Sequence, residues 1–177
     1  MSGLAHWLWH LGDVFIETGS KDGDSLAEAA EHFIECHSIE INSAAHARCA
    51  ERFHELPHVH VHFGDSRTVL PKIIDPARQT VFYLDAHCEG APSAVPEADT
   101  ECPLLGEIRI IATTLWQFRP IVIVDDINMF NPEYWTDPNT NHHLFTRADW
   151  PTLETITAML HGYRYIEDAE NRLGLWV

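Results

Sequence analysis

Runs of apolar and β-branched residues alternate along the chain with runs that carry an apolar side chain every three or four positions. The first pattern predicts strands buried on both faces, and the second predicts amphipathic helices. Strands are expected at about 13–18, 36–41, 59–63, 80–84, 120–124, 163–167 and 173–177. Helices are expected at 24–35, 43–55, 66–74, 104–118 and 152–161, with a further short helix at 2–11.

Strands that alternate with helices pair in parallel, because each helix returns the chain to the same edge of the sheet. A short turn around Asn171 separates the last two strands and requires them to be antiparallel. We therefore expect an α/β three-layer sandwich whose seven-stranded sheet is mostly parallel, with the last strand antiparallel. At 177 residues, one domain over 1–177 is expected, with a lid loop at 88–103 and an aromatic substrate loop at 127–151.

The stretch Glu17–Ser25 joins the first strand to the first helix through two glycines. A strand, a glycine turn and a helix start can cradle a ligand. The glycines lie four positions apart, so the dinucleotide fingerprint with three glycines is absent. Three carboxylates and one lysine in this stretch would repel a pyrophosphate. This composition favours a ligand with positive groups, and S-adenosylmethionine carries a sulfonium and an ammonium.

Acidic residues follow the other predicted strands at the same edge of the sheet. Glu40 lies 23 positions after Glu17, where such sheets bind ribose hydroxyls, although a solvated carboxylate is the alternative. Asp65 and Ser66 follow the third strand, where they could bind an adenine amino group or cap the next helix.

Asp85, Asp125 and Asp126 follow the fourth and fifth strands. Three carboxylates in one crevice repel one another unless a cation joins them, so they favour a Mg²⁺, Mn²⁺ or Ca²⁺ site. The alternative is that Asp125 or Asp126 only caps a loop and that Asp85 contacts the cofactor. His87 lies next to this group and is expected to act as a general base or a nitrogen ligand, with a backbone-bonded loop histidine as the alternative. Glu107, on the following helix, is a further candidate for this group, although a surface charge is favoured.

Histidines and cysteines give weaker patterns. Alternating histidines at 58, 60 and 62 share one expected strand face, where a polar solvent-facing edge is favoured over a metal site. Cysteines at 36, 49, 88 and 102 lack zinc-like spacing and are expected to be reduced, with a Cys88–Cys102 disulfide left open. No orienting acid and no oxyanion motif is evident for Cys88, so a nucleophilic role is rejected.

The chain has 27 Asp and Glu against 11 Lys and Arg, and a formal net charge of −16. Such a charge repels nucleic-acid backbones and anionic membranes, so the expected partner is a small-molecule substrate, with a homodimer left open. No basic leader opens the sequence, and no apolar run approaches the ~18 residues that cross a bilayer. A cytoplasmic protein is expected.

Five short motifs follow successive predicted strands, namely Glu17–Ser25, Ile39–Glu40, Gly64–Ser66, Leu84–His87 and Val124–Asp126. In this order they resemble the S-adenosylmethionine-dependent methyltransferases of the Rossmann-like class. Within that class the chain is most similar to small metal-dependent O-methyltransferases related to the macrocin and catechol enzymes. The resemblance covers roughly residues 13–177.

The resemblance implies a set of residues around the cofactor, namely Glu17, Thr18, Gly19, Ser20, Asp24, Ser25, Glu40, Gly64, Asp65, Ser66 and Asp85. It also implies that Asp85, Asp125 and Asp126 hold the metal. The catechol-type enzymes place a basic lysine shortly after the fourth-strand aspartate. Here Cys88-Glu89-Gly90 supplies none, which shifts that role to His87.

The resulting hypothesis is metal-assisted O-methylation of a small hydroxylated metabolite. A divalent ion, most simply Mg²⁺, would lower the pKa of a substrate hydroxyl, and His87 together with Asp85 would form the catalytic group. Two alternatives remain open from the residues alone. One is a metal-dependent hydrolase that uses the Asp/His cluster, and the other is a non-catalytic module that binds S-adenosylmethionine.

Overall fold

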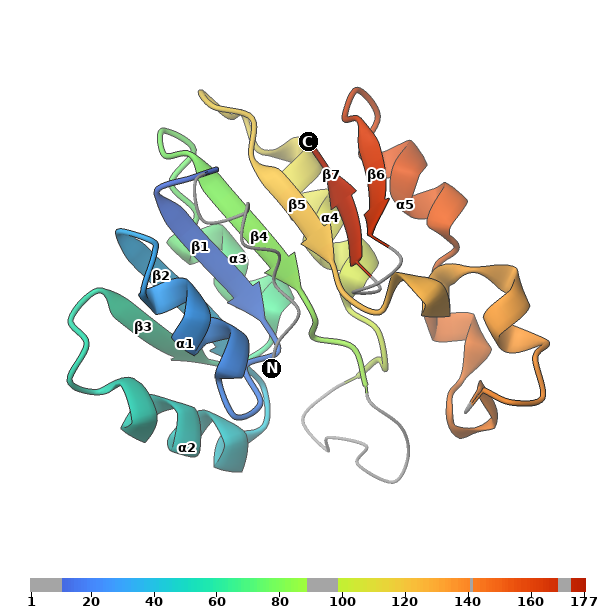
Figure 1. The fold of residues 1–177 in the computed structure, drawn as a ribbon, viewed down its shortest axis with the longest axis horizontal. Helices are drawn as coiled ribbons and strands as arrows, with labels where there is room; N and C mark the ends of the chain where they lie inside the picture. The colour runs from blue at the N-terminus through green and yellow to red at the C-terminus, as the bar shows by residue number, and fades with distance from the viewer. Residues whose placement is uncertain (1–10, 89–98, 141, 169–172) are drawn as a thin grey trace.

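A seven-stranded sheet forms the middle layer of the computed structural model, and helices pack against both of its faces (Figure 1). The structure describes residues 11–88, 99–140, 142–168 and 173–177. The strands are β1 (Val14–Thr18), β2 (Glu35–Glu40), β3 (Val59–Phe63), β4 (Thr80–Leu84), β5 (Ile121–Val124), β6 (Tyr165–Asp168) and β7 (Leu173–Trp176). The α-helices are α1 (Asp24–Ala30), α2 (Ser43–Phe53), α3 (Ser66–Ile73), α4 (Leu104–Thr113) and α5 (Leu153–Met159).

The strands lie in the order β3-β2-β1-β4-β5-β7-β6. The first five run parallel, whereas β7 is antiparallel to both β5 and β6. Every residue of β1, β4 and β5 is buried, as their nearly continuous apolar runs predict for parallel strands covered on both faces. The expected α/β fold with a mostly parallel sheet and an antiparallel last strand is confirmed.

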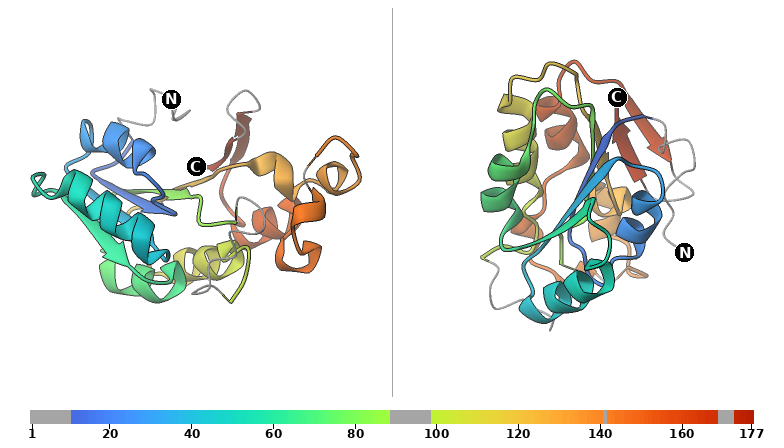
Figure 2. Two further views of the ribbon diagram at one scale, coloured as in Figure 1. Left: turned by 90° about the horizontal axis from the view of Figure 1, so that it is seen from below. Right: turned by 90° about the vertical axis from the view of Figure 1, so that its left-hand side faces the viewer.

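Two apolar cores lie on opposite faces of the sheet. On one face α1 and α2 bury Leu26 and Phe53 against the strands. On the other face α3, α4 and α5 bury Leu70, Ile108 and Ile156. Figure 2 shows the two groups of helices on either side of the strands, which is the three-layer arrangement expected from the sequence.

Two helices end earlier than their apolar periodicity predicts. Helix α1 ends at Ala30 rather than near 35, and the following turn places Phe33 against Phe15, with ring centroids 5.3 Å apart. Helix α4 ends at Thr113 rather than at 118. There the hydroxyls of Thr113 and Thr114 bond back to carbonyls of the preceding turn at 2.7 and 2.8 Å, and such bonds compete with helix continuation.

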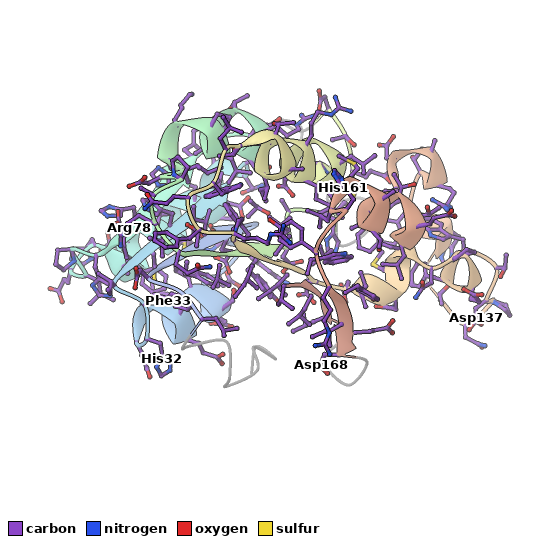
Figure 3. The ribbon with its side chains drawn as sticks, turned by 90° about the horizontal axis from the view of Figure 1, so that it is seen from above. His32, Phe33, Arg78, Asp137, His161 and Asp168 are labelled. Atoms are coloured by element: carbon purple, nitrogen blue, oxygen red, sulfur yellow. The ribbon has the colours of Figure 1, made fainter. Side chains whose placement is uncertain are left out.

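The segment after β5 forms short 3₁₀ helices at Ile127–Phe130, Pro132–Trp135, His142–Leu144 and Arg147–Asp149. It extends beyond the sheet on the side of β6, away from β3 (Figure 1). Viewed from above in Figure 3, Asp137 of this segment and Arg78 of the β3–β4 side lie toward opposite ends of the molecule. The aromatic loop therefore extends the molecule on the β6 side of the sheet.

Three expectations lie outside the described residues, namely the helix at 2–11, the central part of the lid loop at 89–98 and the turn around Asn171. All four cysteines are free thiols, and Cys36, Cys49 and Cys102 are buried. Within the described ranges, no helix combines the length and the apolar character needed to span a membrane.

The histidine pattern in β3 differs in part from expectation. The ring of His58 bonds to the carbonyl of Ala30 at 3.0 Å, so this residue does not join the other two. His60 and His62 instead stack on His37 of β2, with centroids 5.0 and 5.3 Å apart. The nearest ring nitrogens of His37 and His62 lie 3.0 Å apart and share a hydrogen bond.

The central strand β4 supplies the most direct test of the core. Phe82 is fully buried and packs edge-on against Trp116, with centroids 5.7 Å apart. Replacing Phe82 by Ala should lower the free energy of unfolding by about 3–5 kcal/mol, because a large cavity is left in a packed interior. Phe118 is 46% exposed, so Phe118→Ala should cost less than about 1 kcal/mol. Urea denaturation measures both, and equal losses would contradict this placement of the core.

Candidate functional site

A cavity of about 390 Å³ opens where β1, β2, β3 and β4 reach their carboxyl ends. Ligands of open parallel sheets bind at these ends, and the volume lies within the ~300–1,000 Å³ typical of small-molecule sites. The lining residues come from the strand ends, from the 99–103 segment and from Asp149; the charged ones are Lys21, Glu40, Asp65, Arg67, Asp85, His87, Asp99, Glu101 and Asp149.

Gly19 allows the loop after β1 to lie against the end of β4. Its φ is +86°, in the left-handed region that glycine tolerates best. A Cβ atom at this position would lie 2.3 Å from the carbonyl oxygen of Asp85. The backbone N–H of Gly19 also donates to the carbonyl of Ile39 at 2.9 Å. No larger residue could occupy position 19 without moving the cavity wall.

Glu40 ends β2 as a fixed acceptor in the cavity wall. Its carboxylate accepts the backbone N–H of Lys21 at 2.9 Å and that of Asn42 at 2.7 Å, one on each oxygen. Each carboxylate oxygen has a second acceptor site, and the residue lines the cavity although it is only 8% exposed. Glu40 can therefore accept hydrogen bonds from the hydroxyl groups of a ligand without moving.

Glu17 lies beneath the glycine loop and does not line the cavity. Its carboxylate accepts hydrogen bonds from the hydroxyls of Ser25 and Ser38, and Ser38 also bonds to Ser20 at 2.5 Å. Burial raises the pKa of Glu17 to about 7, although both serine hydrogen bonds act in the opposite direction. Glu17, Ser20 and Ser25 are thus brought together as the support of the loop, and the buried Thr18 lies beside them in sequence.

The other acidic residues of the loop face away from the cavity. Asp22 pairs with Arg48 at 3.2 Å and Asp24 pairs with Arg52 at 2.8 Å, all on exposed side chains. Asp24 does not line the cavity. The sequence could not reveal these pairs, because the arginines lie on α2, more than twenty residues away.

Asp65 is engaged by its own neighbour. It caps α3 by accepting the backbone N–H of Arg67 at 2.8 Å, and the Arg67 guanidinium donates to both of its oxygens. These bonds lower the pKa of Asp65. Arg67 also bonds to Asp99 at 2.5 Å, across the start of α4. Gly64, Asp65 and Ser66 all line the cavity, and the capping alternative for Asp65 is present in the structure.

His87 stands between two carboxylates. Its Nδ1 lies 3.6 Å from Asp85 and its Nε2 lies 3.4 Å from Asp126. Burial alone would lower the pKa of His87, but the carboxylates of Asp126, Asp85 and Asp125 outweigh that effect and raise it. Burial raises the pKa of Asp85 to about 8. Asp85 and His87 both line the cavity, so they form a proton-holding pair at its wall.

The three aspartates do not converge on one point. Asp125 accepts the Tyr83 hydroxyl at 2.7 Å on one oxygen and the backbone N–H of Asp126 at 2.7 Å on the other. The His87 ring separates Asp85 from Asp126. In the part of the chain that the structure describes, no group of three or more His, Cys, Asp or Glu side chains could hold a metal ion. These residues therefore do not fit the predicted magnesium site.

Aromatic residues of the 127–151 segment surround His87 instead of lining the cavity. The rings of Trp150 and Phe130 lie 5.3 and 6.3 Å from His87 between centroids, and both are buried. Trp135 and Phe145 pack on the far side of Trp150, at 5.8 and 5.3 Å. This aromatic cluster packs around the imidazole, whose side chain is only 5% exposed.

Two residues of the cavity lining, Glu101 and Asp149, were missed from the sequence, and the expected surface position of Glu107 was wrong. Glu101 accepts the backbone N–H of Thr146 at 2.6 Å, and its own N–H donates to Asp149 at 3.1 Å, which ties the 99–103 segment to the aromatic loop. These contacts are long-range and leave no local pattern. Glu107 is 1% exposed rather than on the surface. Its position three residues after Leu104 on the apolar face of α4 was the available indication.

Comparison with known proteins identifies the fold. No protein-family model and no curated protein matches the chain. Among solved structures, the methyltransferase PaMTH1 of Podospora anserina, bound to S-adenosylhomocysteine, aligns with a TM-score of 0.67, 15% identity and coverage of 93% of this chain and 71% of that one. The O-methyltransferase TomG of Streptomyces achromogenes, in complex with S-adenosylmethionine, aligns with a TM-score of 0.61 and 17% identity. The alignment covers 94% of this chain and 73% of that one.

A third match differs in the atom it methylates. The N-methyltransferase NodS of Bradyrhizobium japonicum aligns with a TM-score of 0.52, 14% identity and coverage of 93% of this chain and 84% of that one. At these identities the likeness concerns the fold. The chain therefore has the Rossmann-like fold of S-adenosylmethionine-dependent methyltransferases.

The buried Glu17 predicts a pH dependence of stability. Its folded pKa of about 7 exceeds the ordinary value of 4.5, so the folded state keeps a proton that the unfolded state releases. Its contribution is complete below pH 4.5 and is lost as the pH rises through 7. Relative to wild type, Glu17→Gln should gain about 2–3 kcal/mol of unfolding free energy between pH 5 and pH 8. Urea denaturation at both pH values measures this gain, and a pH-independent difference would contradict the burial of a carboxylate here.

Proposed function

We propose that the protein transfers a methyl group from S-adenosylmethionine to a hydroxyl of a small hydroxylated metabolite. One observation carries the proposal. Gly19, Glu40 and Asp85 end adjacent parallel strands and line one cavity, in a chain with the methyltransferase fold. A cavity of this kind in this fold is the natural place for the cofactor and its acceptor.

The part of the cavity that would hold the cofactor is identified by the hydrogen-bond acceptors of Glu40 and by the loop at Gly19. Glu40 would accept both ribose hydroxyls, because its two oxygens are fixed by backbone N–H groups and retain free acceptor sites. The loop at Gly19 would lie against the methionine portion, since it reaches the end of β4. Ser66 and the start of α3 would lie beside the adenine.

The acceptor end is assigned to Asp85 and His87. When bound, S-adenosylmethionine supplies an electrophilic methyl group, which the acceptor oxygen attacks as the carbon–sulfur bond breaks and leaves a neutral thioether. Asp85 lies in the cavity wall, where its ionised form, which predominates above its pKa of about 8, can accept the hydroxyl proton. His87 faces Asp85 through Nδ1 and holds that carboxylate in position. The residues thus contribute mainly orientation and proton acceptance.

No step of this mechanism passes through a metal ion. Both oxygens of Asp125 already accept hydrogen bonds, and the imidazole occupies the space between the other two aspartates. Of the acid side chains that suggested a metal centre in the sequence, Asp125 bonds to Tyr83 and the backbone, and Asp85 and Asp126 face His87. The proton-accepting group is therefore assigned to the protein alone.

Cofactor binding is the first test. Titration calorimetry with S-adenosylhomocysteine should give one site per chain for the wild type. Glu40→Ala should weaken binding by about 10- to 100-fold, because hydrogen bonds to a charged acceptor are lost. Glu51 lies on the exposed side of α2, so Glu51→Ala should bind like the wild type. If the wild type gives no heat, the assignment to this cofactor is wrong.

Turnover separates the proton-accepting group from the former metal hypothesis. With labelled S-adenosylmethionine and a panel of diols, phenols and sugars, Asp85→Asn should lower kcat by about 10²–10⁴-fold, since general-base catalysis is lost. Asp125→Asn keeps an oxygen for the Tyr83 hydroxyl and should retain at least about one-tenth of the rate. A loss for Asp125→Asn as large as that for Asp85→Asn would favour a metal-ligand role and contradict this mechanism.

A further inference from the structure

Glu107 is a buried acid that the proposed mechanism leaves unused. It lies in the first turn of α4, on the same helix face as the buried Leu104, Ile108 and Ile111, and is itself 1% exposed. Its Oε1 atom is inaccessible and accepts no hydrogen bond from any described residue. A buried carboxyl oxygen without a partner is costly in free energy, and an apolar side chain would avoid that cost. Such a group calls for an explanation in terms of function.

A second unpartnered atom lies in the same region of the chain's interior. The hydroxyl of Thr18, at the end of β1, is buried and has no hydrogen-bond partner among the described residues. The hydroxyls of Thr18 and Ser66 both approach Glu107 closely enough to lower its pKa, whereas burial, the larger effect, raises it to about 7. The carboxyl group therefore lies between the end of β1 and the start of α3.

The neutral form of Glu107 would satisfy both unpartnered atoms. A carboxylate can only accept hydrogen bonds, whereas a protonated carboxyl group has one O–H donor and retains acceptor sites. Its O–H can donate to the Thr18 oxygen while the other carboxyl oxygen accepts from the hydroxyl of Ser66. Both neighbours frame the cavity, because Thr18 directly precedes Gly19 and accepts the backbone N–H of Asp85 at 3.0 Å, and Ser66 lines the wall.

We propose that Glu107 is a positioning residue of the cavity, which as a neutral acid links Thr18 to Ser66 and fixes the glycine loop relative to the start of α3. This inference rests on the proposed function, since it takes the cavity to hold the cofactor. Glu107 touches no ligand itself. It acts through Thr18, which directly precedes Gly19, and through Ser66, which lines the cavity, so its loss should weaken ligand binding more than folding.

The charged surroundings of Glu107 are few. His87 at the end of β4 favours its ionised form, whereas Asp65 at the start of α3 opposes it. Arg67 pairs with Asp65 and Asp99, and its stem packs on Gly106. Helix α5 contributes Glu154, which is exposed. None of these groups pairs directly with Glu107, so its own protonation decides whether the link to Thr18 is made.

The test compares S-adenosylhomocysteine affinity by calorimetry at pH 6 and pH 8.5. Wild-type affinity should fall at least fivefold between the two values, as Glu107 ionises. Glu107→Gln carries a permanent donor and acceptor, so its affinity at pH 6 should equal that of the wild type. At pH 8.5 the variant should bind S-adenosylhomocysteine at least threefold more tightly than the wild type, because glutamine does not ionise. Glu154→Gln, a surface control, should keep the wild-type profile.

A leucine variant separates positioning from folding. Glu107→Leu should bind at least tenfold more weakly than wild type at pH 6, while it still unfolds in one cooperative urea transition, because leucine fits the apolar face of α4 beside Leu104 and Ile108. Wild-type affinity for Glu107→Leu at pH 6, or an identical pH dependence for wild type and Glu107→Gln, would overturn the inference. The absence of binding by the wild type would overturn the proposed function itself and this inference with it.

Discussion

The parallel pairing of β2, β1 and β4 is the constraint on which the site depends. In this register Thr18 lies beside Ile39 on one side and Leu84 on the other. The next residues of the three strands, Gly19, Glu40 and Asp85, therefore reach the same edge together. Hydrogen bonds from Gly19 to Ile39 and from Asp85 to Thr18 continue the ladders into the loops. The cavity is thus a consequence of strand register, with the helices on both faces supplying its walls.

Buried acids give this cavity its chemical character. Burial raises the pKa of Glu17, Asp85 and Glu107 to about 7 or 8, so these groups change charge near neutral pH. Each has a different place: Glu17 supports the glycine loop, Glu107 lies between the end of β1 and the start of α3, and Asp85 lies in the cavity wall. The strong net negative charge of the chain makes such desolvated acids harder to ionise. Stability and ligand binding are expected to respond to pH through the same few residues.

The sequence predicted the fold better than the site. Strands such as β4 and β5 are buried on both faces and therefore read as continuous apolar runs, which identifies them without tertiary information. The ends of helices were harder to predict from the sequence, because the end of α4 depends on hydrogen bonds from the hydroxyls of Thr113 and Thr114. The directions in which the acidic side chains point could not be predicted from the sequence. Asp125 turns toward Tyr83 on the neighbouring strand, and that contact decides against convergence of the aspartates.

A crystal structure with S-adenosylhomocysteine would test the central claim most directly. The account predicts that the ligand lies across the carboxyl ends of β1, β2 and β4, with its ribose hydroxyls about 2.7 Å from the carboxylate oxygens of Glu40. The sulfur should point toward Asp85 and His87. Ligand density elsewhere on the molecule, or a ribose that does not contact Glu40, would contradict the account.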